Sequence, residues 1–310
     1  MDASLIDVLK AAFLGVVEGL TEFLPVSSTA HLRIAEALMK IPLGASACSI
    51  GNTACLQDVA YWNMYTIVIQ VGAIMALCLL FLERIINFLR TFPSGETGDR
   101  TWLNHPISLT LIAFVFTSVP ALLLRKWSEK NLGSLNAMAI ALLAGGIVMW
   151  VVDAWSERHE PSTTHVEEMT LPQAVWIGLC QALSAIFPGT SRSMSTIAAG
   201  QLAGLDRPAA LEFSFLLSIP TMIAATGWDL IKEVHASKSV DGAVATAHVV
   251  MNGQRWIVLI IGTIVSFIVA LGVVEWFLHW VRKHGFTMFA IYRILLGSAL
   301  LIWGSRLIAH

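Results

Sequence analysis

The sequence predicts an all-α polytopic membrane protein, and its scarcity of charge is the first reason. Of 310 residues, 56% are hydrophobic and only 13% are Asp, Glu, Lys or Arg, whereas a soluble domain carries about 25% charged residues. So few charges cannot cover the surface of a water-soluble globule of this size. The formal net charge is −2, so there is no excess of positive charge to neutralise phosphates, which excludes nucleic acid as a partner.

Long apolar segments are the second reason. A membrane-spanning helix needs about 20 mostly apolar residues, because lipid offers no partner for an unpaired backbone amide. Six segments meet this requirement: 61–82, 106–124, 132–152, 213–228, 256–274 and 287–305. Arg293, in the last of them, is the one charged residue that these segments contain. We therefore predict six transmembrane helices.

Two further apolar segments break in the middle. Segment 5–24 stops at Pro25 and segment 171–187 stops at Pro188, and polar residues follow each proline. A second helical segment comes after each break, at about 30–39 and 194–205. Irregular polar backbone at membrane depth is tolerated only where it is buried in protein or lines a wet cavity. We predict two re-entrant helix hairpins, and two ordinary spans with polar loops are the alternative.

The two broken segments resemble each other at a constant offset of 163 positions. The identities at this offset include Gly15 with Gly178, Leu20 with Leu183, Pro25 with Pro188, Ser28 with Ser191, and Ile34 with Ile197. Three predicted spans separate the copies, so the second hairpin must enter from the opposite face of the membrane. This predicts an inverted-topology repeat within one domain over 1–310, with repeats at about 1–155 and about 170–310.

Two carboxylates lie in the first broken segment. Glu18 and Glu22 are four positions apart and share one face of a helix. Two like charges close together in a low dielectric cannot both stay ionised unless they share a cation or a proton. Oxygen ligands favour Mg²⁺ or Ca²⁺ over zinc, so we predict a divalent cation at this pair. A single protonated glutamate that caps backbone is the alternative.

Ser27, Ser28 and His31 follow at the first break. Ser27 or Ser28 is placed to cap the next helix, and the first amides of a helix form a ready anion site. His31 is predicted to lie one turn further on, facing the glutamate pair. A capping serine alone is more often structural. The prediction of a functional site therefore depends on the combination of Glu, Glu, Ser and His at one break.

The second break supplies a positive charge. Arg192, between Ser191 and Ser193, precedes a helix, and a guanidinium is the side chain best matched to phosphate oxygens. The predicted phosphate-binding residues are Ser27, Ser28, Ser191, Arg192 and Ser193. The predicted catalytic residues are Glu22, Ser28, His31 and Arg192, a set suited to metal-assisted phosphoryl transfer. Ser28 or a water attacks, and Glu22 or His31 handles protons.

The residues around the two breaks resemble the signatures of a known family. Segment 15–32 reads GVVEGLTEFLPVSSTAHL and segment 188–193 reads PGTSRS. Both resemble signatures of the bacterial undecaprenyl-diphosphate phosphatases, the enzymes linked to bacitracin resistance. Segments 212–220 and 289–293 look like further family segments, so the similarity covers nearly the whole chain.

This resemblance implies a metal-dependent enzyme that removes the terminal phosphate from a polyprenyl diphosphate and so recycles the lipid carrier of cell-wall synthesis. It also implies six spans with two re-entrant hairpins, a bacterial plasma-membrane location and a periplasm-facing site. On the family's pattern Glu18, Glu22, Ser28, His31 and Arg192 carry over as active-site positions, with the nucleophile left open. The sequence leaves the oligomeric state open, a homodimer included.

A secondary transporter or lipid flippase is the rival interpretation, because inverted repeats with broken helices are a transporter architecture. A transporter, however, has no use for a hydrolytic Glu, Glu, Ser and His set. The remaining polar residues carry weaker expectations: Arg293 snorkels to the interface or contacts phosphate, and Gln70, Ser214 and Ser218 are candidates to line the cavity. Cys48 and Cys55 either form a disulfide or remain two free thiols.

Overall fold

The computed structural model describes residues 3–42, 53–95, 98, 100–131, 134–236 and 251–308. In these residues the chain is helical, and the β-structure consists of one isolated bridge between Thr163 and Leu205. A short 3₁₀ helix covers Val166–Glu168. The α-helices in chain order are α1 Ala3–Thr21, α2 Ser28–Leu38, α3 Thr53–Leu80, α4 Leu82–Thr91, α5 Pro106–Asn131, α6 Leu135–Ser156, α7 Leu171–Ile186, α8 Arg192–Leu202, α9 Arg207–Ala236, α10 Gly253–His284 and α11 Thr287–Ile308.

Six of the described helices are long and apolar enough to cross a membrane, which confirms the predicted multi-pass, all-α class. Their apolar portions are Cys55–Leu80, Pro106–Ser128, Leu135–Ser156, Arg207–Trp228, Gly253–His284 and Thr287–Gly304. The helices extend beyond the predicted spans because charged residues near a helix end do not interrupt its backbone hydrogen bonds. Helix α10, for example, continues through Glu275 and ends at Gly285, whose φ of 64° suits a residue without Cβ.

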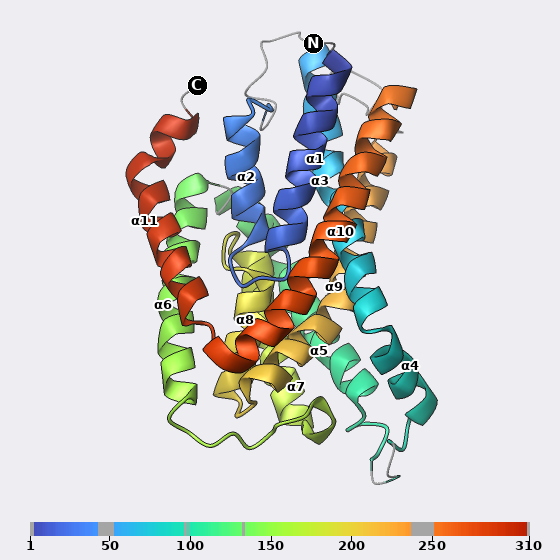
Figure 1. The fold of residues 1–310 in the computed structure, drawn as a ribbon, viewed down its shortest axis with the longest axis vertical. Helices are drawn as coiled ribbons and strands as arrows, with labels where there is room; N and C mark the ends of the chain where they lie inside the picture. Colours follow the sequence, from blue (N-terminus) through green and yellow to red (C-terminus); the bar gives the residue numbers. More distant parts are fainter. Residues whose placement is uncertain are drawn as a thin grey trace.

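The two broken segments form helix hairpins whose tips meet in the middle of the molecule (Figure 1). Helices α1 and α2 make the first hairpin, and α7 and α8 make the second. The Ser193 hydroxyl of the second tip donates a 2.9 Å hydrogen bond to the carbonyl of Leu24 in the first. The hairpin shape follows the prediction from the two prolines, and the re-entrant placement in a bilayer stays a prediction.

Equivalent glycines let each hairpin pack closely on a spanning helix. A Cβ on Gly15 of α1 would lie 2.5 Å from the carbonyl oxygen of Gly262 in α10, and one on Gly178 of α7 would lie 2.4 Å from that of Ala113 in α5. The two glycines are one of the pairs at offset 163. The first helices of the two hairpins therefore use the same packing device, as the repeat predicts.

The offset changes by one residue at the breaks. Ser27 and Ser191 both precede the second helix of their hairpin, and both have a left-handed φ, 74° and 72°. They are structurally equivalent at an offset of 164, so the pairing of Ser28 with Ser191 is wrong by one position. The reason is that one residue separates Pro25 from Ser27, whereas two separate Pro188 from Ser191. The first of these two, Gly189, has a φ of +95°. Ser28 is instead equivalent to Arg192, each the first residue of its helix.

Gly178→Val is expected to destabilise the protein, because the new side chain would collide with the backbone of α5. Overpacking of this kind costs about 1–3 kcal/mol, which should appear as a lower unfolding temperature in detergent. Gly272→Val on α10 is the matched control, since no described atom beyond the adjoining turns of its own helix lies within 4 Å of its Cβ position. Equal unfolding temperatures for the two variants would contradict the close approach of α7 and α5.

The predicted Cys48–Cys55 disulfide cannot be compared with the structure. Cys48, half of the predicted Cys48–Cys55 disulfide, lies outside the described residues. The pairing stays a prediction.

Candidate active site

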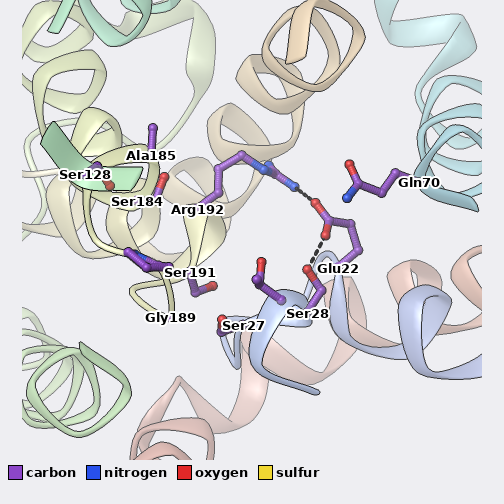
Figure 2. Close-up of a pocket in the computed structure, with 12 residues that line it drawn as sticks. Glu22, Ser27, Ser28, Gln70, Ser128, Ser184, Ala185, Gly189, Ser191 and Arg192 are labelled. Carbon is purple, nitrogen blue, oxygen red and sulfur yellow. Dashed lines mark hydrogen bonds and ion pairs between the residues drawn. The ribbon is translucent and has the colours of Figure 1, made fainter. Parts of the chain in front are cut away.

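A cavity of about 390 Å³ lies where the two hairpin tips meet (Figure 2). Both second helices begin at this cavity, since Ser28 opens α2 and Arg192 opens α8. The first amides of a helix have no intrahelical acceptor and favour an anion. The residues that line the cavity are Glu22, Ser27, Ser28, Thr29, Gln70, Ser128, Ser184, Ala185, Pro188, Gly189, Ser191 and Arg192.

Glu22 connects the two tips at this cavity. Its Oε1 accepts a 3.0 Å hydrogen bond from Nη2 of Arg192 in the second hairpin, and its Oε2 accepts a 2.5 Å bond from the hydroxyl of Ser28 (Figure 2). All three side chains line the cavity. A hydroxyl that is hydrogen-bonded to a carboxylate is the arrangement of a nucleophile with its general base. The structure therefore brings together three of the four predicted catalytic residues.

Arg192 retains hydrogen-bonding capacity for a ligand. A guanidinium has five N–H donors, and Nη2 is used on Glu22 and, at 3.4 Å, on the sulfur of Met222. Its Nη1 is buried and finds no acceptor in the described part of the chain. The ring of Phe23 lies 5.8 Å from the guanidinium carbon, a cation–π distance that helps to fix the orientation of the side chain. The remaining donors suit phosphate oxygens.

A serine cap was predicted at the first break, but the structure has one at the second break and none from Ser27 at the first. Ser191 accepts from the Met194 amide at 3.4 Å, and its hydroxyl lies 3.1 Å from that of Ser193. Ser27 precedes α2, yet its side chain makes no capping bond there. Both Ser27 and Ser191 hold a left-handed φ, which costs a non-glycine residue of order 1–3 kcal/mol and is frequent at functional sites. Ser193, also a predicted phosphate ligand, is fully buried and bonds to Leu24.

Glu18 lies behind the cavity wall and does not line the cavity. It is fully buried and interacts electrostatically with both Glu22 and Arg192. Neither of its carboxylate oxygens has a hydrogen-bond partner among the described residues. Among the described residues, no group of three or more His, Cys, Asp or Glu side chains is placed to hold a metal ion. Two carboxylates nevertheless fit Mg²⁺ or Ca²⁺, because such ions usually complete their shell with water and substrate phosphate.

His31 faces α11 and not the glutamate pair, so its predicted orientation is wrong. Its Nδ1 donates to the Ser27 carbonyl at 2.8 Å, because a carbonyl can only accept. In the neutral ring, Nε2 then accepts from the Tyr292 hydroxyl at 2.6 Å, and the two rings stack 5.6 Å apart. His31 is not among the residues that line the cavity. In this arrangement the imidazole fixes the backbone carbonyl of Ser27, the residue that precedes Ser28.

Arg293 is fully buried, so the predicted snorkelling to the interface is wrong. Its guanidinium donates to carbonyls of both breaks, Pro25 at 3.1 Å in the first and Gly189 and Thr190 at 3.2 and 2.8 Å in the second. It also donates to the carbonyl of Ala141 in α6 at 3.4 Å. One cation therefore joins both tips to a spanning helix. The sequence shows that Arg293 lies within an apolar span, but it did not predict this anchoring role.

The weaker cavity candidates divide into two groups. Gln70 lines the cavity as predicted. Ser214 and Ser218 are buried elsewhere, hydrogen-bonded at 2.6 Å to the Thr196 hydroxyl and to the Phe215 carbonyl respectively. Ser128 and Ser184 also line the cavity, and nothing in their sequence surroundings distinguishes them from other helix serines.

Comparisons with known proteins agree with the motifs. The model of the family described as bacitracin resistance protein BacA matches residues 11–299. The chain is similar to the undecaprenyl-diphosphatase of Koribacter versatilis, with 54% identity over 298 residues, 96% of this chain and 98% of that protein. It is 38% identical over 294 residues to that of Caldanaerobacter subterraneus, covering 94% of both chains. It is 37% identical over 296 residues to that of Rhizobium etli, covering 95% of this chain and 96% of the other. The resemblance inferred from the two breaks is confirmed.

Proposed function

Because the chain belongs to the bacitracin resistance protein BacA family, we propose that it hydrolyses undecaprenyl diphosphate to the monophosphate and phosphate in the cavity between the hairpin tips. The observation that carries this proposal is the contact of Ser28, Glu22 and Arg192 across the two tips. It supplies a hydroxyl, a base and a cation at one place. The activity in the names of the relatives requires those three functions.

In the proposed reaction Ser28 is the nucleophile. Its Oγ attacks the terminal phosphorus while Glu22 takes the hydroxyl proton, and Arg192 binds the phosphate oxygens. The bond from phosphorus to the bridging oxygen breaks, and the lipid monophosphate leaves. Glu22 releases this proton to solvent as the lipid monophosphate leaves. A water then attacks the phosphoserine, and Glu22 takes a proton from that water and passes it to the departing Ser28 Oγ. The bond from phosphorus to Oγ breaks, which frees Ser28 and releases phosphate. A base so placed contributes about 10²–10⁴-fold to rate.

A divalent cation, Mg²⁺ or Ca²⁺, completes the proposal. The Glu18 and Glu22 carboxylates would hold it, and when bound it would neutralise charge on the diphosphate. The buried Glu18 carboxylate, which has no hydrogen-bond partner among the described residues, supports this assignment.

The cellular setting is part of the same proposal. Family membership and bacterial relatives support a location in the plasma membrane, with the cavity facing the periplasm, where the product re-enters cell-wall synthesis as a lipid carrier. The homodimer stays a prediction. A transporter or flippase built on the same hairpins is the alternative, and hydrolysis separates the two.

Phosphate release from undecaprenyl diphosphate by the purified protein tests the function. We expect release with Mg²⁺ or Ca²⁺, loss on chelation, and recovery when the cation is returned. Ser28→Ala should lower kcat by about 10²–10⁴-fold and abolish labelling of the protein by terminal ³²P. Ser118→Ala is the control, since the hydroxyl of this serine donates to the Phe114 carbonyl within α5 and Ser118 does not line the cavity. If the native protein releases no phosphate, the hydrolase proposal fails and the transporter interpretation remains. If phosphate release persists without a cation, only the proposed metal dependence is overturned.

A further inference from the structure

An apolar groove of about 550 Å³ lies between α6, α7 and α8. It shares the second hairpin with the catalytic cavity. Leu183, Phe187 and Thr190 line the groove, whereas their chain neighbours Ser184 and Pro188 line the cavity. One side of α7 and its break therefore borders a polar space, and another side borders an apolar one.

The groove has small residues along its length and large ones at its edge. Ala141 and Ala144 of α6 and Ala198 of α8 are among the small residues that line it. Small residues on membrane helices usually let two helices close on each other, but here they border open space. Ile140 and Leu202, also in the lining, are 56% and 46% exposed, so the groove opens on the outer, apolar surface of the helix bundle.

We propose that this groove binds the part of the isoprenoid tail that lies next to the diphosphate of the substrate. The proposal rests on the proposed function, since it assigns a place to the tail of the same lipid. A head group in the cavity needs a path for its tail past a hairpin tip, and the groove begins at Thr190 of that tip. Along α6 it extends from Ala137 to Val148, about 16 Å at the rise of an α-helix.

Arg293 joins the groove wall to the cavity wall. It bonds to the carbonyl of Ala141, whose residue lines the groove, and to that of Gly189, whose residue lines the cavity. The two spaces are thus held in a fixed relation. Since lipid is as apolar as the groove, the tail gains little from the hydrophobic effect by entering it. The groove acts by shape, placing the terminal phosphate against Ser28.

Filling the groove should therefore penalise substrates according to their tails. Ala144 is exposed on α6, so Ala144→Phe would place a ring in the groove without displacing buried side chains. We expect kcat/KM for undecaprenyl diphosphate to fall about tenfold or more, the discrimination that pocket shape commonly gives. The value for methyl diphosphate, which has no isoprene unit to enter the groove, should stay unchanged. Ala224→Phe, exposed on α9 outside both spaces, should leave both values unchanged. Equal losses on both substrates, or no loss, would overturn the assignment.

A second measurement does not depend on hydrolysis. A polyprenyl monophosphate with a diazirine in its first isoprene unit should label α6 and α8, and unlabelled polyprenyl monophosphate should compete. If an active protein is labelled outside α6 and α8, the groove is not the tail-binding site, and the proposed hydrolase function still stands. Labelling of the groove in a protein that releases no phosphate would support the tail site and overturn the hydrolase. Equal competition by phospholipid would show that the groove holds ordinary membrane lipid and would overturn the proposal.

Discussion

Glu22→Gln is expected to lower kcat for phosphate release by about 10²–10⁴-fold, the usual contribution of a general base. The amide keeps the shape of the side chain and still offers an oxygen to Arg192, but it cannot take the proton of Ser28. Because the guanidinium is no longer held by a carboxylate, its affinity for phosphate should not fall. The kinetics are measured at saturating Mg²⁺ or Ca²⁺, because Glu22 is also a proposed ligand of the cation. Under this condition KM should stay equal or decrease while kcat collapses, which steady-state kinetics separates directly.

The double variant sharpens this expectation. If Glu22 acts through Ser28, Glu22→Gln combined with Ser28→Ala should be no slower than Ser28→Ala alone, since residues that act as a unit are not additive. Glu36→Gln is the matched control: Glu36 is also buried, lies on α2, and pairs with Arg33 at 3.4 Å. Additive losses, or an equal loss in the control, would show that Glu22 is not the base for Ser28.

Arg293→Lys is expected to damage both stability and activity although it keeps the charge. A single ammonium cannot reproduce the planar fork that reaches both breaks, so several buried carbonyls would lose their donor, at about 1–3 kcal/mol each. The two tips would then lose their common anchor. A displacement of about 1 Å at reacting groups costs on the order of 10²-fold, so kcat should fall by at least that factor.

The measurement pairs thermal unfolding in detergent with kinetics well below the unfolding temperature of the variant. Arg33→Lys serves as control, because Arg33 is partly exposed and its ion pair with Glu36 is of the kind that contributes little. Native kcat in folded Arg293→Lys would mean that the tips hold their positions without this guanidinium.

Much of the fold could be predicted because lipid imposes a simple rule on the chain. The lengths of apolar segments located the six spans, and Pro25 and Pro188 marked the breaks. The site could be predicted in part for the same reason: in so apolar a sequence, Glu22 and Arg192 are conspicuous. Their types suggested the chemistry, and their positions at the two breaks suggested that they meet.

What the sequence did not reveal depends on contacts between distant segments. The orientation of His31 is set by Tyr292, which comes from α11. The role of Arg293 depends on backbone carbonyls, which every residue carries and no motif marks. The one-residue shift between the hairpins depends on φ angles at Ser27 and Ser191, and identities in an alignment of two short segments do not resolve it.

The equivalence of Ser28 and Arg192 has a consequence for how the two halves of the chain divide the chemistry. Each is the first residue of a corresponding helix, yet one is a neutral hydroxyl and the other a permanent cation. In the proposed mechanism the first half supplies the nucleophile and its base, and the second half supplies the guanidinium that binds phosphate. Two copies of either half would each lack one of these parts. On this proposal the catalytic unit is the heterologous pair, and it requires that the two halves differ.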